Sequence, residues 1–282
     1  MKKIYLGRHV FGLAAILFSG VTLAWQNFNI WQQIQPLGQV PSHRILAVIA
    51  ATVEVFGGVA IQWRRTARGG ALALWAIYSV FALLWLPRVI AGPLVYDNWG
   101  NFFEQCSQVA GALVLYATLD GTDSERAKKM ARTGYIVFGL CVISFTLEQL
   151  FYLSGTAEFV PKWVPPGQMF WAVATTVAFA LAAIALLSGK TALLASRLLT
   201  AMVVSFGLLI WLPAVFADPH KLTNWAGNAE NLSIAGAAWI VSDLLRRTGA
   251  VSIRSRVSMA ELVPYSQAAN AAPAQASTRL RA

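Results

Sequence analysis

The sequence predicts an all-α integral membrane protein with eight transmembrane helices, arranged as two tandem four-helix bundles in parallel orientation. Composition, the length of the apolar runs and an internal repeat predict this fold. Hydrophobic residues make up 57% of the 282 residues and charged residues 12%, whereas a soluble domain carries about 25% charged residues. The apolar residues occur in runs of roughly 20, which is the length that crosses a hydrocarbon core of about 30 Å. A lipid bilayer is therefore the expected environment.

Eight apolar segments end near Gly, Pro or charged residues. Their ranges are 7–25, 45–63, 70–91, 101–119, 132–153, 168–188, 193–217 and 228–245. The first segment follows basic residues, as the apolar part of a signal peptide does. However, its Val10-Phe11-Gly12-Leu13 recurs as Val137-Phe138-Gly139-Leu140 deep inside the chain. We therefore expect the first segment to remain in the protein as a membrane helix.

The basic residues predict the orientation in the membrane. Of the 22 Lys and Arg residues, all but Arg44, Arg88, Lys162 and Lys221 fall at the termini or in every second connection. An excess of Lys and Arg marks the cytoplasmic side, so both termini are predicted to be cytoplasmic in a bacterial inner membrane. This requires an even number of spans. The net charge of +10 is thus explained by topology, and no nucleic-acid partner is predicted.

The two stretches 85–112 and 211–238 are similar without a gap at an offset of 126, with 11 of 28 positions identical. The identities include Trp, Pro, Asn and Glu, which chance similarity between apolar helices would not produce. The sequence therefore predicts a duplication, with repeats at 1–120 and 132–247. Residues 121–131 are the predicted linker, and 248–282 a predicted disordered cytoplasmic tail.

The matched polar residues are candidates for ligand binding because they gather at the non-cytoplasmic end of the fourth helix of each repeat. They are Asn98, Trp99 and Glu104 in the first copy and Asn224, Trp225 and Glu230 in the second. The tryptophans also suit anchoring at the headgroup level, and an Asn side chain can cap free backbone N–H groups. Each Glu could instead accept bonds from a neighbouring Trp, Asn or helix end and lock the halves together. A ligand-binding or proton-handling role is the alternative.

Two acidic residues lack a matched partner. Glu54 lies near the middle of the second predicted helix, and Glu148 lies in the outer half of the fifth. A carboxyl group at such depth is costly, so it indicates either a function or a specific partner. Arg88 is the only basic residue placed deeply enough in a predicted helix to be that partner.

Several chemistries are excluded by the absence of their motifs. Haem needs axial ligands inside the bundle, whereas His9, His43 and His220 lie at predicted helix ends or in loops. No Walker, dinucleotide-binding or zinc-protease motif occurs, so no haem or flavin motif and no metal site is predicted. Cys106 and Cys141 are expected to be buried thiols rather than a redox pair.

The stretch Phe159-Val160-Pro161-Lys162-Trp163-Val164-Pro165-Pro166-Gly167 precedes an apolar helix that opens with Phe170-Trp171-Ala172. Together with the four-helix unit and its Trp-Leu-Pro…Asn-Trp ending, this stretch resembles the DoxX-like membrane proteins. The resemblance covers about 5–120 and 130–245, so the chain looks like a fused pair of such units. It implies a four-helix membrane bundle. Some family members are subunits of thiosulfate:quinone oxidoreductase, and others are associated with thiol-redox or oxidative-stress systems.

These observations predict an accessory protein that binds a small amphiphile, such as a quinone or a lipid, in a polar pocket at the periplasmic face between the halves. One alternative is a membrane subunit of a quinone-linked oxidoreductase with a separate soluble or membrane redox partner. Another is a transporter coupled to protons through Glu54 or Glu148. Whether the protein is an enzyme is left open by the sequence.

Overall fold

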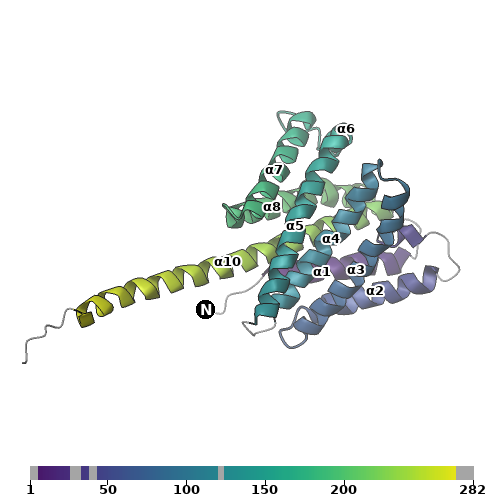
Figure 1. The fold of residues 1–282 in the computed structure, drawn as a ribbon. Coiled ribbons are helices and arrows are strands. Elements are labelled where there is room, and N and C mark those ends of the chain that lie inside the picture. The colour runs from purple at the N-terminus through teal and green to yellow at the C-terminus, as the bar shows by residue number, and fades with distance from the viewer. Residues whose placement is uncertain (1–5, 26–32, 38–42, 120–123, 271–282) are drawn as a thin grey trace, which may run out of the picture. The chain divides into compact units, whose positions relative to one another are not determined.

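A computed structural model describes residues 6–25, 33–37, 43–119 and 124–270, with side chains as far as residue 248. The chain divides into two compact units, 1–244 and 245–282. Every regular element in the described residues is helical (Figure 1). The elements are α1 (Leu6–Trp25), η2 (Gln35–Leu37), α2 (His43–Ala60), α3 (Ala67–Ala91), α4 (Tyr96–Thr118), α5 (Glu125–Phe151), α6 (Leu153–Phe159), α7 (Gln168–Ser188), α8 (Ala192–Phe206), the π-helical η3 (Gly207–Trp211), α9 (Leu212–Ala217) and α10 (Leu222–Asn270).

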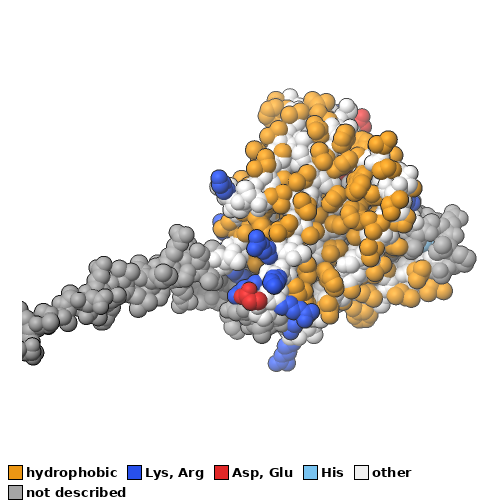
Figure 2. Space-filling model, in the orientation of Figure 1, with side chains coloured by type: hydrophobic (Ala, Val, Ile, Leu, Met, Phe, Trp, Pro, Cys, Tyr) orange, Lys and Arg blue, Asp and Glu red, His pale blue; other side chains and the backbone are white. Residues whose placement is uncertain are grey.

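Six helices of the described residues are long and apolar enough to cross a membrane: α1, α2, α3, α5, α7 and the continuous run α8–η3–α9. Large apolar side chains on these helices face outward, among them Ile49, Leu83 and Ile184, which are 55%, 60% and 65% exposed. Figure 2 shows a surface that is mostly hydrophobic. Such a surface is stable only when lipid covers it. The chain is therefore an all-helical, multi-pass membrane protein.

The remaining predicted spans, 101–119 and 228–245, lie in α4 and α10, which are not among the six. Helix α4 carries a dense set of polar residues, and α10 continues across the division between the two units. It runs past the predicted repeat boundary at 247 to Asn270, and residues 271–282 of the predicted tail lie outside the described residues. At the predicted linker, α5 begins at Glu125 instead of residue 132.

Helices that are neighbours in sequence pack side by side in the same order in both parts of the chain. Helix α1 packs on α2 and α2 on α3, while α5 packs on α7 and α7 on α8. The closest contacts use small residues. A Cβ added at Gly12 would lie 2.7 Å from Ile61 Cγ1, and one at Gly139 would lie 2.7 Å from Leu187 Cδ2. Gly12 and Gly139 occupy matched positions of the two predicted repeats.

Helices α4 and α10 contact each other at a pair of matched positions of the predicted repeats. A Cβ added at Gly111 on α4 would lie 2.7 Å from the Cβ of Ala237 on α10, and these two positions are 126 residues apart. The flanking contacts are also matched: Gly134 of α5 packs on Val114 of α4, and Gly7 of α1 packs on Ile240 of α10.

The stretches 66–93 and 191–219 also match each other, but the second stretch is one residue longer. Phe81-Ala82-Leu83-Leu84 is followed directly by Trp85, whereas Phe206-Gly207-Leu208-Leu209 is followed by Ile210 and then Trp211. The structure accommodates the additional residue as the π-helical turn Gly207–Trp211. Such turns insert one residue into a helix and are frequent at functional sites.

Candidate functional site

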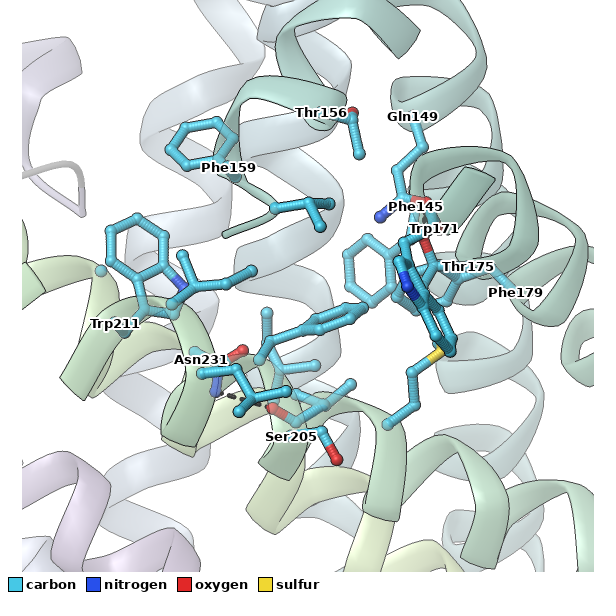
Figure 3. Close-up of a pocket in the computed structure, with 18 of the residues that line it drawn as sticks. Phe145, Gln149, Thr156, Phe159, Trp171, Thr175, Phe179, Ser205, Trp211 and Asn231 are labelled. Atoms are coloured by element: carbon cyan, nitrogen blue, oxygen red, sulfur yellow. Dashed lines mark hydrogen bonds between the residues drawn. The ribbon is translucent and has the colours of Figure 1, made fainter. Parts of the chain in front are cut away.

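A cavity of about 620 Å³ lies among α5, α6, α7, α8, η3 and the first part of α10 (Figure 3). Aromatic and aliphatic side chains form most of its wall. The aromatic members include Phe145, Phe159, Trp171, Phe179, Phe206 and Trp211. Ile210, the additional residue of the π-helical turn, also lines it. The volume and the apolar lining are those of a site for a small organic molecule.

Amide and hydroxyl groups in this wall are held by the surrounding helices. Gln149 Oε1 accepts hydrogen bonds from Thr175 Oγ1 at 3.2 Å and from Thr176 Oγ1 at 3.1 Å. Asn231 Nδ2 donates to the carbonyl of Val203 at 2.9 Å, where α8 meets the π-helical turn (Figure 3). These bonds fix polar groups of three different helices at the cavity.

Three carboxyl groups from three helices meet at the same cavity: Glu104 of α4, Glu148 of α5 and Glu230 of α10. The side chains of Glu104 and Glu230 form a hydrogen bond with each other, which two carboxyl groups can do only when one of them carries a proton. Glu230 Oε1 has no hydrogen-bond partner among the described residues. The Glu148 carboxyl packs against Gly100, where an added Cβ would lie 2.6 Å from Oε1. The cavity therefore combines an apolar body with an acidic region, which we call the carboxyl cluster.

The carboxyl cluster gathers residues that the sequence singled out for separate reasons. Glu104 and Glu230 are matched positions of the predicted repeats, and Glu148 has no acidic counterpart. Their meeting follows from the crossing of α4 and α10 about two turns further on, at Gly111 and Ala237. The sequence predicts a polar pocket between the halves. The cavity instead lies mainly within the second half and is mainly apolar, and Glu104 is its contribution from the first half.

Asn98 and Asn224 use their amides to hold the end of the preceding helix. Asn98 Nδ2 donates to the carbonyls of Arg88 and Gly92, both at 3.2 Å. Asn224 Nδ2 donates to those of Ala214 at 2.9 Å and Asp218 at 3.1 Å. The sequence suggests that these residues cap N–H groups, whereas the structure shows that they bind carbonyls at the end of the preceding helix, each of which also accepts a backbone N–H bond.

The matched tryptophans form an equally repeated bond. Trp99 Nε1 donates to the carbonyl of Pro93 at 3.0 Å, and Trp225 Nε1 donates to that of Pro219 at 2.9 Å. The indole and amide donors at these helix ends thus bind backbone carbonyls rather than the Glu104 or Glu230 carboxylates. None of the four residues lines the cavity.

Glu54 lies outside the cavity, in a polar cluster inside the first half. Its side chain is 0% exposed and faces Ser19, Tyr78 and Gln33. Gln33 Nε2 donates to Glu54 Oε1 at 3.4 Å and to Gln108 Oε1 at 3.3 Å. Tyr78 of this polar cluster is the position matched to Val203, which lines the cavity in the second half.

Arg88 does not serve as the partner of Glu54 that the sequence suggests. Its Nη2 donates to the backbone carbonyl of Gln35 at 3.1 Å and its Nη1 to Gln35 Oε1 at 3.4 Å. The guanidinium also lies 5.1 Å from the ring centre of Trp85. Arg88 thus fastens η2 to the end of α3.

Sequence reasoning identified the three acids but not the aromatic wall of the cavity. Aromatic residues at helical spacing are indistinguishable in sequence from ordinary core or lipid-facing residues. The extra residue Ile210 was one available signal, because the offset between the matched residues changes by one there, beside the cavity.

Possible metal ligands and cysteines were both located in the part of the chain that the structure describes. No group of three or more His, Cys, Asp or Glu residues there could hold a metal ion. Cys106 and Cys141 are free thiols.

The fold and the cavity define a multi-pass, α-helical membrane protein with a mainly apolar internal site and a carboxyl cluster. Comparison of the chain with protein-family models, with curated proteins and with solved structures gives no match.

Proposed function

We propose that this protein binds one small amphiphile in the cavity of its second half and acts as an accessory, ligand-binding membrane protein. The observation that carries the proposal is a cavity of about 620 Å³ with aromatic walls and a carboxyl cluster. Sites for small organic molecules are concave and mainly apolar, with few polar groups that orient the ligand. The polar groups here belong to different helices, so a bound molecule would contact several helices at once.

The architecture that we propose for this function is a tandem pair of four-helix units with eight spans, similar to the DoxX-like proteins. Helix α4 has 23 residues, about 34 Å at 1.5 Å per residue, and it packs between the candidate spans α3 and α5. Burial of its polar face against these neighbours would permit a span of low hydropathy. The matched bonds of Asn98 and Asn224 and the Gly111–Ala237 contact support the duplication.

We further propose that both termini are cytoplasmic and that the carboxyl cluster belongs to the periplasmic half of a bacterial inner membrane. Arg8 Nη2 donates to the Gln62 carbonyl at 3.4 Å, and Arg68 Nη2 to Tyr116 Oη at 3.4 Å. These contacts bring the start of α1, the α2–α3 connection and the end of α4 to one basic side. Glu104 lies in the opposite half of α4.

Mass spectrometry of the protein purified from its native membrane tests the proposal. Ser205 lines the cavity (Figure 3), so Ser205→Trp would obstruct it. Val80 is the matched position on α3, is 48% exposed and does not line the cavity, which makes Val80→Trp the control. We expect the wild type and Val80→Trp to carry a co-purifying amphiphile that Ser205→Trp lacks. Equal occupancy in all three proteins, or no bound molecule in any, would contradict the proposal.

A quinone as the bound molecule would favour the alternative of a quinone-linked oxidoreductase subunit. The aromatic wall suits a flat ring, and this alternative requires a redox partner to co-purify with the chain. Proton-coupled transport would instead require a hydrated path to Glu54 or to Glu148. Glu54 is fully buried among protein side chains. Glu148 lines the cavity, so it is the better candidate of the two for a proton-carrying group.

A further inference from the structure

The carboxyl cluster lies in a cavity whose described lining is acidic without being basic. Glu104, Glu148 and Glu230 line the cavity, and none of its lining residues in the described part of the chain is Lys or Arg. Asp97, about two turns before Glu104 on α4, adds a further acidic group near Glu148. A buried carboxyl group without a basic neighbour is neutralised either by its own proton or by a positive group beside it. A positive group entering the cavity would supply that neutralisation.

We propose that the ligand is an organic cation with an apolar body, such as a lipophilic amine or a quaternary ammonium or phosphonium ion. This inference rests on the proposed function, because it assigns the chemical class of the ligand to the same cavity. Its basis is the juxtaposition of a carboxyl cluster with an aromatic cavity wall.

The three carboxyl residues line the cavity, where a positive head group of a ligand would meet them. Glu230 Oε1 lacks a hydrogen-bond partner among the described residues, and Glu148 is pressed against Gly100, where only the missing side chain of glycine leaves it room. An unpaired carboxyl oxygen in such surroundings is costly. A cation in the cavity can pair with the ionised carboxylate and so removes this cost, whereas a neutral quinone brings no charge and leaves the carboxyl group to be neutralised by a proton.

The wall of the cavity suits the remainder of such a ligand. Phe145 and Phe179 contact each other edge to face, with ring centres 5.8 Å apart, and Phe206 lies 6.3 Å from Phe179. Phe159 and Trp211 form a second pair on the other side of the cavity, at 5.9 Å (Figure 3). Aromatic faces attract cations whose charge is spread over organic groups. The same rings provide apolar surface for the ligand body.

Tetraphenylphosphonium and tetraphenylborate test the inference because they have nearly the same shape and opposite charge. Binding of each radiolabelled ion to the full-length protein in nanodiscs is measured by equilibrium dialysis, with empty nanodiscs subtracted. We expect saturable binding of the phosphonium at one site per chain and no saturable binding of the borate. Saturable binding of the borate at equal affinity would overturn the inference.

Glutamine variants locate the charge that binds the cation. We expect Glu148→Gln and Glu230→Gln each to weaken phosphonium binding by roughly tenfold or more, as loss of one partner of a desolvated ion pair does. Glu158→Gln is the matched control, since Glu158 is an exposed acid on α6 that does not line the cavity. Its affinity should stay within twofold of the wild type. Equal affinity in all four proteins would contradict a role for the carboxyl cluster.

The outcome separates this inference from the proposed function. If mass spectrometry finds a neutral amphiphile that Ser205→Trp excludes, and the phosphonium does not bind, the cavity is a ligand site and the assignment of a cation is wrong. If neither a native molecule nor either ion occupies the cavity, the proposed function fails as well. Thermal unfolding of each variant identifies any loss of binding that results from misfolding.

Discussion

Removal of the amide at Asn98 or Asn224 is expected to destabilise the protein by about the same amount in each half. Each amide donates two hydrogen bonds, at 3.2 Å for Asn98 and at 2.9 and 3.1 Å for Asn224, to carbonyls at the end of the preceding helix. One such bond contributes about 0.6–1 kcal/mol to stability. The loss of two bonds in Asn98→Ala or Asn224→Ala should therefore cost about 1–2 kcal/mol.

The free energy of unfolding can be measured by adding sodium dodecyl sulfate to protein in dodecylmaltoside micelles and following helix content by circular dichroism. Asn228→Ala is the matched control, because Asn228 is close to Asn224 on α10 and its side chain forms no hydrogen bond in the described residues. We expect the control to change the free energy by less than about 0.5 kcal/mol. The double variant of Asn98 and Asn224 should show additive losses, because the two sites share no partner.

Two results would refute this reasoning. If both variants unfold at the same detergent fraction as the wild type, the amide bonds do not hold the helix ends. If stability is unchanged but binding of tetraphenylphosphonium is lost, Asn98 and Asn224 belong to the ligand site, as the sequence suggests, and not to the scaffold.

Three further predictions concern packing, a loop contact and the π-helical turn. Gly12→Ala should destabilise the protein by about 1–3 kcal/mol, and Gly139→Ala by clearly less in the same titration. The reason is that the new Cβ meets a backbone carbonyl of α2 at Gly12 but a leucine side chain, which can move, at Gly139. Arg88→Ala should lose the bonds to Gln35 and about 1 kcal/mol of stability. Equilibrium dialysis should show unchanged phosphonium binding, and a loss of affinity would place Arg88 in the ligand site. Deletion of Ile210 should restore a regular α-helix with unchanged circular dichroism and abolish phosphonium binding, and retained binding would show that the π-helical turn does not shape the cavity.

The spans that could be predicted most closely are those whose signal is local. The segment predicted at 168–188 is α7, Gln168–Ser188, and the segment predicted at 7–25 is α1, Leu6–Trp25. In both, the apolar run ends where polar or turn-forming residues begin. Helix α5 begins earlier than predicted because Glu125 and the basic residues that follow it continue the helix into the polar connection. Glu, Lys and Arg are good helix formers, so a helix can extend beyond the end of its apolar run.

The sequence could predict which acidic residues belong to the candidate site, but not that they lie close together in space. Glu104, Glu148 and Glu230 each appear in the sequence as acids in apolar helices. Their convergence depends on which helices cross, and sequence periodicity does not contain that information. The sequence also offered Arg88 as a partner of Glu54, whereas the structure pairs it with Gln35. Only the path of the connection between α1 and α2 could reveal this.

The sequence by itself determined that this protein belongs in a membrane and is helical, because hydrophobicity and run length act through the solvent and need no partner. It also placed matched Asn, Trp and Glu residues at the ends of two helices. The tertiary structure alone decided that two of those acids meet each other and Glu148, since the close approach at Gly111 and Ala237 sets how α4 and α10 cross. It also decided that an apolar cavity opens in the second half, where Val203 occupies the position matched to Tyr78 and the π-helical turn with its extra residue forms part of the wall.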